Sequence, residues 1–586
     1  MAYDLVIRNG TVVDGSGGPS YRADVAVSGD RIAEIGRITE RATTEIDAEG
    51  HAVTPGFVDG HTHMDAQVLW DPLGSSSCWH GVTTVVMGNC GFSLAPVRSD
   101  ARELVVRNLE RAEDISPAAL AAGVGWGWET FAEYLDEVDR QPKGINYAAY
   151  VGHSALRTWA MGERAFEKEA DEDDLGRMEV ELGSAMRAGA IGLTTSRSRN
   201  HATSDDRPVA SRLASWSEVQ RLVAVLARER AGVFELALEE AARSQDTERR
   251  AEVLQRLRRL ALDTGVPVSF GVVAGYDDHL LQLIDDVAEA GGTMFGQSHC
   301  RGIATLLSFR TRLPFDRLPE WRDVRARPAD EQLAALADPS VRARLVHAAE
   351  HGDYGRSIGA EARRPDFDHM YVMDAAVPPH ATVAEVAAAR GVAPVEAMID
   401  LAVASRLEQL FIQPITPEDP DVILPFLRHQ GSVMTFSDSG AHVSQIMDSS
   451  IQTHLLAFWV RQRQELALEE AVRMLTSATA DAWGFTDRGR LRAGMAADLN
   501  VFDPDTVAPS MPEVVTDLPG GARRLRQGAS GFKATIVAGQ VVLADGESTG
   551  AFPGRLLRDG SRHDRTRRDG SRHDGIGRDA SRRLPA

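Results

Sequence analysis

Hydrophobic positions divide the chain into two β-rich ends and a long middle part. Near the N-terminus, short apolar runs alternate with turn residues, as in "LVIRNGTVVD" and "DVAVSGDRIAEIG". The same pattern returns near the end, in "ADLNVFDPDTV" and "ATIVAGQVVLADG". Tight hairpin turns are predicted at Asn9-Gly10, Ser28-Gly29 and Ala538-Gly539. We therefore predict one small β domain built from both termini, residues 1–54 and 495–558.

In the middle part, residues 55–494, short apolar strands alternate with long helical stretches. The strands are predicted in "AVTPGFVDGHTH", "GVTTVVMGNCG", "INYAAYVGH", "GAIGLTTS", "GVFELALEE", "PVSFGVV", "GTMFGQSHCRG" and "SVMTFSDSGAH". Segments such as "SWSEVQRLVAVLARERA" and "DTERRAEVLQRLRRLALDT" have apolar residues at helical spacing between them. Eight strand-helix units predict an α/β fold, a (β/α)8 TIM barrel. A doubly wound open sheet has the same alternation and stays open as an alternative.

Two segments depart from this alternation. Roughly 130 residues separate the seventh strand from the eighth, far more than an ordinary connection needs. This insertion between strands 7 and 8 contains predicted helices in "DEQLAALADPSVRARLVHAAEH" and "TVAEVAAARG", and we interpret residues 303–366 as a lid over the barrel mouth. The last residues, 559–586, repeat "RDGSRHD" with almost no apolar side chains, which predicts a disordered tail.

Composition and charge narrow the class of protein. The 586 residues are 43% hydrophobic and 25% charged, as in ordinary soluble proteins. A formal net charge of −21 repels nucleic acid and anionic membranes, so we expect neither as a partner. The N-terminus lacks a targeting pattern and no apolar run has membrane-spanning length, so the predicted location is cytoplasmic. Three scattered cysteines are too few for a disulfide framework.

Polar side chains gather where the predicted strands end, which is the catalytic face of such barrels. They are His61 and His63 on the first strand, Cys90 on the second, His153 on the third, His299 and Arg301 on the seventh, and Asp438 and His442 on the eighth. Because strand side chains alternate between faces, His61 and His63 point the same way. Two imidazoles, a thiolate and a carboxylate on one rim are ligand types that Zn²⁺ selects.

Each candidate also has a plainer interpretation. A single histidine at a strand end, such as His153, is often a hydrogen-bonded structural residue. Cys90 taken alone resembles a small buried hydrophobic residue, but its place between Asn89 and Gly91 at a strand end favours ligation. Arg301 is equally consistent with an arginine in a surface loop. Cys78 and Cys300 are interpreted as structural.

Six motifs resemble a known family. These are "GFVDGHTHMD", "GVTTVVMGNCGFSLAP", "GAIGLTTS", "SDSGAHV", "LTSATADAWGFTDRGRLRAGMAADLNVFDP" and "PGRLLRDG". The chain resembles the amidohydrolase superfamily over about residues 3 to 558, and specifically its branch of N-acyl-D-amino-acid deacylases, or D-aminoacylases. The resemblance implies a metal-bearing (β/α)8 barrel that hydrolyses amide bonds. It also implies that His61, His63 and Cys90 are metal ligands and that Asp438 is the catalytic acid/base and a candidate metal ligand.

The chain departs from the family pattern on three strands. D-aminoacylases normally carry a histidine at the end of strands five and six, whereas these strands here read "VFELALEE" and "VSFGVV". Many other amidohydrolases bridge two metals with a carboxylated lysine from strand four, but strand four, "AIGLTTS", has none. A single-metal plan with His61, His63, Cys90 and Asp438 remains, or a weak site. Glu235 is a candidate replacement ligand, or else a carboxylate that faces the outer helices.

The predicted activity is hydrolysis of a linear amide, with an N-acyl-D-amino acid as the substrate that the resemblance implies. A divalent metal, by ligand type Zn²⁺, would activate water while Asp438 transfers the proton to the leaving nitrogen. His153 or His299 would donate hydrogen bonds to the oxyanion. Arg301 would bind the carboxylate of this small-molecule substrate, with Arg310 and Arg312 as weaker candidates.

Two other functions stay open at this point. The first is hydrolysis of a cyclic amide or another C–N bond, because one barrel chemistry serves many substrates. The second is a scaffold that kept the barrel and lost catalysis, suggested by the missing histidines. A homo-oligomer is possible.

Overall fold

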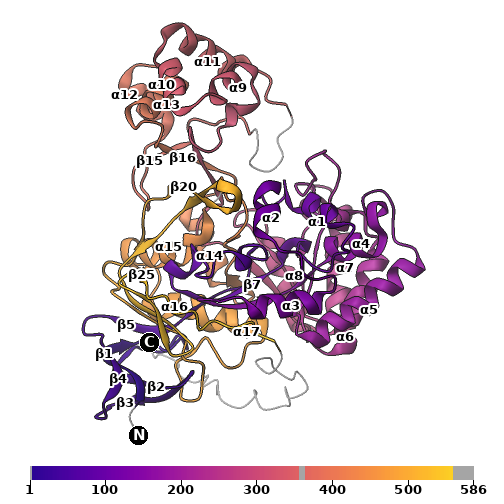
Figure 1. Ribbon diagram of the computed structural model, residues 1–586, viewed down its shortest axis with the longest axis vertical. Coiled ribbons are helices and arrows are strands. Elements are labelled where there is room, and N and C mark those ends of the chain that lie inside the picture. Colours follow the sequence, from indigo (N-terminus) through magenta and orange to yellow (C-terminus); the bar gives the residue numbers. More distant parts are fainter. Residues whose placement is uncertain (1–2, 356–362, 446, 559–586) are drawn as a thin grey trace, which may run out of the picture.

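The computed structural model describes residues 3–355, 363–445 and 447–558 (Figure 1). Its central part contains parallel strands at the eight places that the sequence predicts. They are β6 (Phe57–Asp59), β7 (Val82–Met87), β8 (Asn146–Ala149) with β9 (Val151–Gly152), β10 (Gly192–Ser196), β11 (Val233–Ala237), β12 (Val268–Gly271), β13 (Met294–Ser298) and β17 (Ser432–Met434). One sheet has the order β6-β7-β8, and a second runs from β9 through β10, β11, β12 and β13 to β17.

Hydrogen bonds connect the ends of these two sheets. Strands β8 and β9 are separated by Tyr150, whose N–H donates to the carbonyl of Met87 on β7 at 2.9 Å. At the other end, a parallel bridge joins Thr62, just after β6, to Ser439, just after β17. Asp438 donates its N–H to the carbonyl of His61 at 3.2 Å. The loops that follow the first and last strands are therefore held side by side.

Helices follow the strands and contact one another in chain order, α4 with α5, α5 with α6, α6 with α7 and α7 with α8. Their bounds are α1 (Arg102–Leu109), α2 (Pro117–Gly123), α3 (Phe131–Arg140), α4 (His153–Met161), α5 (Glu172–Ala188), α6 (Trp216–Glu229), α7 (Thr247–Thr264), α8 (Asp278–Glu289), α14 (Pro420–Arg428), α15 (Ile451–His454), α16 (Leu468–Arg473) and α17 (Thr479–Trp483). Helices α6 and α7 confirm the predicted helical segments. In α6 the hydroxyl of Ser215 caps the first turn, and Val219, Leu222 and Leu226 are buried on one face.

Strands from both ends of the chain form one nine-stranded sheet, in the order β25-β24-β23-β18-β5-β1-β2-β3 with β4 beside β1. The bounds are β1 (Tyr3–Val12), β2 (Tyr21–Ser28), β3 (Arg31–Gly36), β4 (Ala42–Asp47), β5 (Ala52–Pro55), β18 (Leu499–Phe502), β23 (Phe532–Val537), β24 (Gln540–Ala544) and β25 (Glu547–Ser548). The hairpin predicted at Ala538-Gly539 is present, since β24 follows β23 after these two residues. The hairpin predicted at Ser28-Gly29 is also present, but its turn lies one residue later, at Gly29-Asp30, because Ser28 still pairs with Arg31.

The hairpin predicted at Asn9-Gly10 is wrong. Strand β1 continues through both residues, and its pairing with β2 shifts register between Ile7 and Gly10. Asn9 adopts a φ of 59°, so it forms a β-bulge rather than a turn. The left-handed conformation that Asn-Gly favours is present, but the strand pairing on both sides of it keeps the chain straight.

Residues 508–530, in the C-terminal part of the chain, form a second and smaller β structure. Strands β20 (Glu513–Leu518) and β21 (Ala522–Arg526) form an antiparallel hairpin, and β19 (Ala508–Pro509) pairs with β22 (Ala529–Ser530). The N–H of Leu525 donates to the carbonyl of Val443 at 2.7 Å, which fixes the hairpin against the loop after β17. Part of the segment predicted for the small β domain therefore reaches the ends of the central strands.

The insertion between β13 and β17 has its own sheet and core, and it forms the upper lobe in Figure 1. Its elements are β14 (Ala304–Ser308), α9 (Pro319–Arg325), α10 (Ala329–Ala337), α11 (Pro339–His351), β15 (Tyr371–Met373), α12 (Val383–Arg390), α13 (Pro394–Ala404) and β16 (Leu410–Pro414). Because β14 pairs with β16, the insertion closes at residue 414, well beyond the predicted end at 366. The long helical segment predicted here is two helices, since Pro339 starts a new one.

Three other sequence predictions concern the C-terminal tail, the cysteines and membrane-spanning segments. The tail at 559–586 lies outside the described residues. Cys78, Cys90 and Cys300 are all free and buried. Within the described ranges, the structure has no helix that combines the length and apolar character needed to cross a membrane.

Candidate metal centre

Two histidines follow β6 directly and are almost completely buried. His61 is 1% exposed and His63 is 5% exposed, and their ring centroids lie 5.3 Å apart. The loop is held by the strand-eight segment, because the N–H of His63 donates to the carbonyl of Ser439 at 2.7 Å. Gly440 permits this approach: a Cβ there would lie 2.5 Å from the carbonyl oxygen of His63. His61 and His63 therefore still point to the same side, as they would on a strand, although they lie after the end of β6.

Four side chains converge at this point, and we call His61, His63, Cys90 and Asp438 the donor cluster. One ligand atom from each of His61, His63 and Cys90 lies within 4.8 Å of the others. His61 Nε2 is 3.5 Å from Cys90 Sγ and 3.2 Å from Asp438 Oδ1, and His63 Nε2 is 3.4 Å from the same oxygen. Ligands at 2.0 to 2.3 Å from a tetrahedral zinc ion would be about 3.3 to 3.7 Å apart. The measured separations fit that spacing closely.

Gln297 on β13 determines which nitrogen of His61 faces the cluster. The amide nitrogen of Gln297 donates to Ser269 Oγ at 2.9 Å, so its oxygen is the atom 2.5 Å from His61 Nδ1. In the neutral ring the hydrogen therefore lies on Nδ1, and the lone pair of Nε2 points toward Cys90 and Asp438. A ring nitrogen, a thiol sulfur and a carboxylate oxygen that face one point suit a shared cation.

Glu113 lies beside the second histidine on the opposite side, and no hydrogen bond joins Glu113 Oε2 to His63 Nδ1. Its Oε2 lies 3.2 Å from His63 Nδ1, and both groups are buried. The carbonyl of Glu113 accepts a hydrogen bond from the N–H of His442 at 2.6 Å, which joins the loop after α1 to the loop after β17. A carboxylate on the far nitrogen of a histidine is the usual support for a metal-ligating imidazole.

Glu235 on β11 contacts the backbone of Cys90. Its Oε2 accepts the N–H of Cys90 at 2.9 Å, and the side chain is 1% exposed. Glu235 thus points inward, which removes the interpretation that it faces the outer helices. Its contact fixes Cys90 in the left-handed conformation, with a φ of 55°.

Several residues in and around the cluster have left-handed backbone conformations. Positive φ angles occur at Cys90 (55°), Phe436 (92°), Asp438 (49°) and His442 (47°). Such conformations cost free energy in residues other than glycine, and they are typical of functional sites. The Phe436 ring lies 4.0 Å from the ring of His61, and it occupies space that a side chain at Gly271 would fill.

The buried charges at this place are strongly coupled. Burial raises the pKa of Glu113 well above its usual value, and the charge of Asp438 raises it further. Burial alone would raise the pKa of Asp438, but hydrogen bonds and charges from His61 and His63 hold it well below its usual range. Burial lowers the pKa of His63 to about 4 and raises that of Glu235 to about 7. An excess of buried acidic groups over cationic ones favours a bound metal cation.

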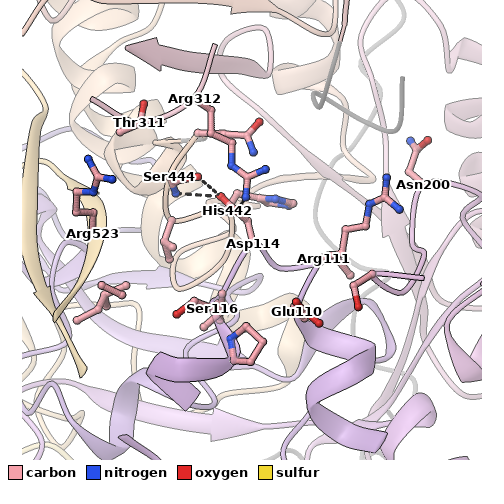
Figure 2. A pocket seen from close by; sticks show the side chains of 18 of the residues that line it. Glu110, Arg111, Asp114, Ser116, Asn200, Thr311, Arg312, His442, Ser444 and Arg523 are labelled. Carbon is pink, nitrogen blue, oxygen red and sulfur yellow. Dashed lines mark hydrogen bonds and ion pairs between the residues drawn. The ribbon is translucent and has the colours of Figure 1, made fainter. Parts of the chain in front are cut away.

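An open cavity of about 740 Å³, which we call the mouth pocket, is bordered by the segments that follow α1 and β17 (Figure 2). Among the described residues that line it, no member of the donor cluster occurs. Its lining includes His201 and His442, the latter close enough to lower the pKa of His63 electrostatically. The acidic residues in its lining are Glu110, Asp114 and Asp206. Five arginines also line it: Arg111, Arg310, Arg312, Arg317 and Arg523. Figure 2 shows Asp114 bound to Ser444 beneath Arg312, with Arg523 on the opposite wall. Cationic side chains thus outnumber acidic ones here, in a chain of net charge −21.

The structure does not bring all predicted substrate-binding residues to this cavity. His153 is fully buried, with hydrogen bonds to Thr195 Oγ1 at 2.8 Å and Glu218 Oε1 at 2.9 Å, so both ring nitrogens are already used. Its predicted role as an oxyanion donor is therefore wrong. Arg301 binds the carbonyl of Met447 and the carboxylate of Asp448, and it does not line the mouth pocket.

His299 remains close to the cluster. Its ring lies 4.9 Å from that of Phe436, which in turn contacts His61. Neither ring nitrogen of His299 has a hydrogen bond partner among the described residues. The predicted candidates Arg310 and Arg312 both line the mouth pocket, where Arg312 forms an ion pair with Asp114 at 2.7 Å.

Sequence reasoning missed Glu113, Gln297 and His201. Gln297 lies two residues before His299 on the same strand, so the period of two was a usable signal. Glu113 and His201 lie in loops, where no periodicity marks the direction of a side chain.

The comparisons with known proteins agree with this geometry. The model of the amidohydrolase family matches residues 44–543. The D-aminoacylase of Alcaligenes xylosoxydans xylosoxydans is 29% identical over 562 residues, which cover 95% of this chain and 97% of the relative. The N-acyl-D-glutamate deacylase of the same organism is 29% identical over 566 residues, covering 95% and 96%.

Solved structures give the same result. A crystal structure of D-aminoacylase matches with a TM-score of 0.63 and 25% identity, covering 95% of this chain and all of that one. Another D-aminoacylase structure with the same TM-score concerns the functional role of a binuclear metal centre. The family match extends over most of the chain. The chain therefore belongs to the amidohydrolase family, in the branch of the D-aminoacylases, and is a metal-binding hydrolase of carbon–nitrogen bonds.

Proposed function

We propose that the protein hydrolyses the linear amide bond of an N-acyl-D-amino acid, releasing a carboxylic acid and a D-amino acid. The observation that carries the proposal is the spacing of the donor cluster, 3.2 to 3.5 Å between neighbouring ligand atoms, with His61 Nδ1 beside the amide oxygen of Gln297 and Nε2 facing the cluster. The D configuration rests on the names of the relatives, which are a D-aminoacylase and deacylases of N-acyl-D-glutamate and N-acyl-D-aspartate.

The donor cluster fits a divalent metal, and its mixture of imidazole, thiolate and carboxylate favours Zn²⁺. His61, His63 and Cys90 would hold the ion, with Asp438 beside it. When bound, zinc lowers the pKa of coordinated water to about 7 and polarises a carbonyl oxygen. Glu113 and Gln297 would hold the two histidines in the orientation and tautomer that ligation needs.

Asp438 is the proton carrier of the proposed reaction. Its low pKa keeps the carboxylate ionised at neutral pH, as a general base requires. It would accept a proton from the attacking water and deliver it to the departing amide nitrogen. Phe436, stacked between His61 and His299, would keep bulk water away from the reacting atoms.

The mouth pocket is the proposed path for the substrate. Arg312 and Arg523 lie on different walls of it and would attract a carboxylate, which every N-acyl amino acid carries. Arg523 comes from β21, so the hairpin after the small sheet would take part in substrate binding. The insertion borders the same pocket through Arg310 and Thr311, which supports the interpretation as a lid.

Two finer features of the architecture belong to the same proposal. The eight strands form a closed (β/α)8 barrel, supported by chain-order pairing and by the Thr62–Ser439 bridge. Residues 1–54 and 495–558 form a separate small β domain, supported by the sheet shared between the two ends.

Metal analysis combined with turnover measurements tests the function. Protein purified without chelator should contain metal and release amino acid from N-acyl-D-amino acids but not from their L forms. Asp438→Asn should abolish this release while leaving the fold intact. Turnover of cyclic ureides instead would indicate the other C–N hydrolase, and metal-free, inactive protein that Zn²⁺, Co²⁺ and Mn²⁺ all fail to activate would indicate a scaffold.

A further inference from the structure

A second cavity, which we call the side pocket, lies between the insertion and the segments that follow β13 and β17. Its volume is about 350 Å³, within the range of small-molecule sites. One wall is apolar and comes from the sheet of the insertion, with Leu306 on β14, Met373 on β15 and Ile412 on β16. Among the described residues that line it, no member of the donor cluster occurs.

The opposite wall is formed by a helix of unusual type. Phe458 and Trp459 belong to the π-helical segment η9 (Leu455–Gln462), which continues from α15. Such wide helical turns are rare and are found frequently at functional sites, because they displace side chains that a regular helix would align. Here the widening places both aromatic rings beside the cavity.

A cation and an anion stand side by side at the polar end. Arg301 Nη2 is 3.0 Å from Asp448 Oδ1, and both residues line the cavity. All three hydrogen bonds that Arg301 donates among the described residues leave from Nη2, to Met447, Asp448 and Ser450. Asp448 is 3% exposed, and its Oδ2 has no hydrogen bond partner in the described part of the chain.

His454 adds a third buried polar group. Its side chain lines the cavity, stacks on Phe458 at 5.2 Å, and is 3% exposed. Its Nδ1 has no hydrogen bond partner among the described residues. Burial, with the nearby charges of Arg301 and His380, lowers its pKa well below the usual value, so the ring is neutral. Unpartnered buried hydrogen-bonding groups are costly, and the presence of Asp448 Oδ2 and His454 Nδ1 around one cavity indicates a polar ligand.

We propose that the side pocket binds a free α-amino acid with an apolar side chain. The ligand carboxylate would take the free edge of the Arg301 guanidinium, and the ammonium group would donate to Asp448 Oδ2. Because the two charges of an α-amino acid are separated by one carbon atom, they match a cation and an anion in direct contact. Leu306, Met373 and Ile412 on one side and Phe458 on the other would enclose the side chain. Within the described ranges, the side pocket shares no lining residue with the mouth pocket.

Calorimetric titration with leucine tests the proposal in Asp438→Asn protein, so that the result does not depend on catalysis. D-leucine and L-leucine are titrated separately, beside 4-methylpentanoate, which lacks the amine, and 3-methylbutylamine, which lacks the carboxylate. At least one leucine enantiomer should bind saturably, and each truncated compound should bind at least about tenfold more weakly. Absence of saturable binding by both enantiomers, or equal binding of 4-methylpentanoate, would overturn the proposal.

Two neighbouring alanines supply a matched pair of variants. Ala376 lines the side pocket, whereas Ala375 next to it is exposed and does not line it. Ala376→Trp should fill the cavity and weaken leucine binding at least about tenfold, and Ala375→Trp should leave it within about twofold. Asp448→Asn should weaken leucine binding while leaving binding of 4-methylpentanoate unchanged. If Ala376→Trp and Ala375→Trp bind leucine equally, the ligand lies elsewhere and the proposal is wrong.

Discussion

Replacing Gln297 by leucine removes the carbonyl oxygen that accepts the hydrogen bond from His61 Nδ1 at 2.5 Å. The change in volume is small, so the surrounding strands should keep their positions. What changes is the tautomer of His61: without an acceptor on Nδ1, the hydrogen is free to move to Nε2, the nitrogen that faces Cys90 and Asp438. A protonated Nε2 does not ligate a metal ion.

The expected loss of metal affinity follows from removing the hydrogen bond between Gln297 and His61. Removing the hydrogen bond partner of a metal-ligating histidine typically weakens binding about 10- to 100-fold, or about 1.4 to 2.7 kcal/mol. The variant also leaves Ser269 Oγ and His61 Nδ1 without their buried partners, which should destabilise the metal-free protein by about 1 to 3 kcal/mol.

Competition with a chromophoric zinc chelator measures the affinity, and thermal unfolding of the metal-free protein measures the stability. Gln297→Glu is the matched control, because it keeps an acceptor at the same place and should retain or increase the affinity. Ser269→Ala keeps the acceptor as well and should change the affinity little. A folded Gln297→Leu protein that binds zinc as tightly as the unmodified chain would refute the tautomer argument.

Four further predictions concern individual residues. Asp438→Asn should lower turnover about 10²- to 10⁴-fold through loss of proton transfer; near-normal turnover in steady-state assays would exclude Asp438 as the acid/base. Cys90→Ser should lower zinc content after dialysis more than it lowers the melting temperature, because a hydroxyl is a poorer zinc ligand than a thiolate. The pKa of Glu235 is raised from 4.5 to about 7. Between these pH values the folded metal-free protein therefore retains a proton that the unfolded chain has released. The free energy of unfolding should fall by about 3 kcal/mol as pH rises from about 4.5 to about 7. Glu235→Gln should flatten this slope in urea titrations, though only in part, since Asp65 has a pKa raised to about 7 as well. Arg523→Met should raise the KM for N-acyl amino acids about tenfold without changing metal content; an unchanged KM would remove the hairpin from the substrate site.

Local sequence patterns were sufficient for most of the fold. The periods of 3.6 and 2 predicted helices α6 and α7 and the central strands, because both periods depend on residues that are close in the chain. Local signals failed where pairing partners decided the outcome. Asn9-Gly10 has the composition of a turn, but strand β2 pairs on both sides of it, and the chain makes a bulge instead.

The candidate site likewise has features that the sequence predicts and features that depend on the tertiary structure. By itself, the sequence determined that His61 and His63 share a face, that Cys90 and Asp438 end other strands, and that no lysine of strand four is present. Only the tertiary structure decided what supports these residues: Gln297 is 236 positions from His61, and Glu235 is 145 positions from Cys90. It also assigned His153 to a buried network with Glu218 and placed Arg301 at a different cavity. The direction of a side chain on a strand is a local property, whereas the group that it meets depends on which distant segments the fold packs against it.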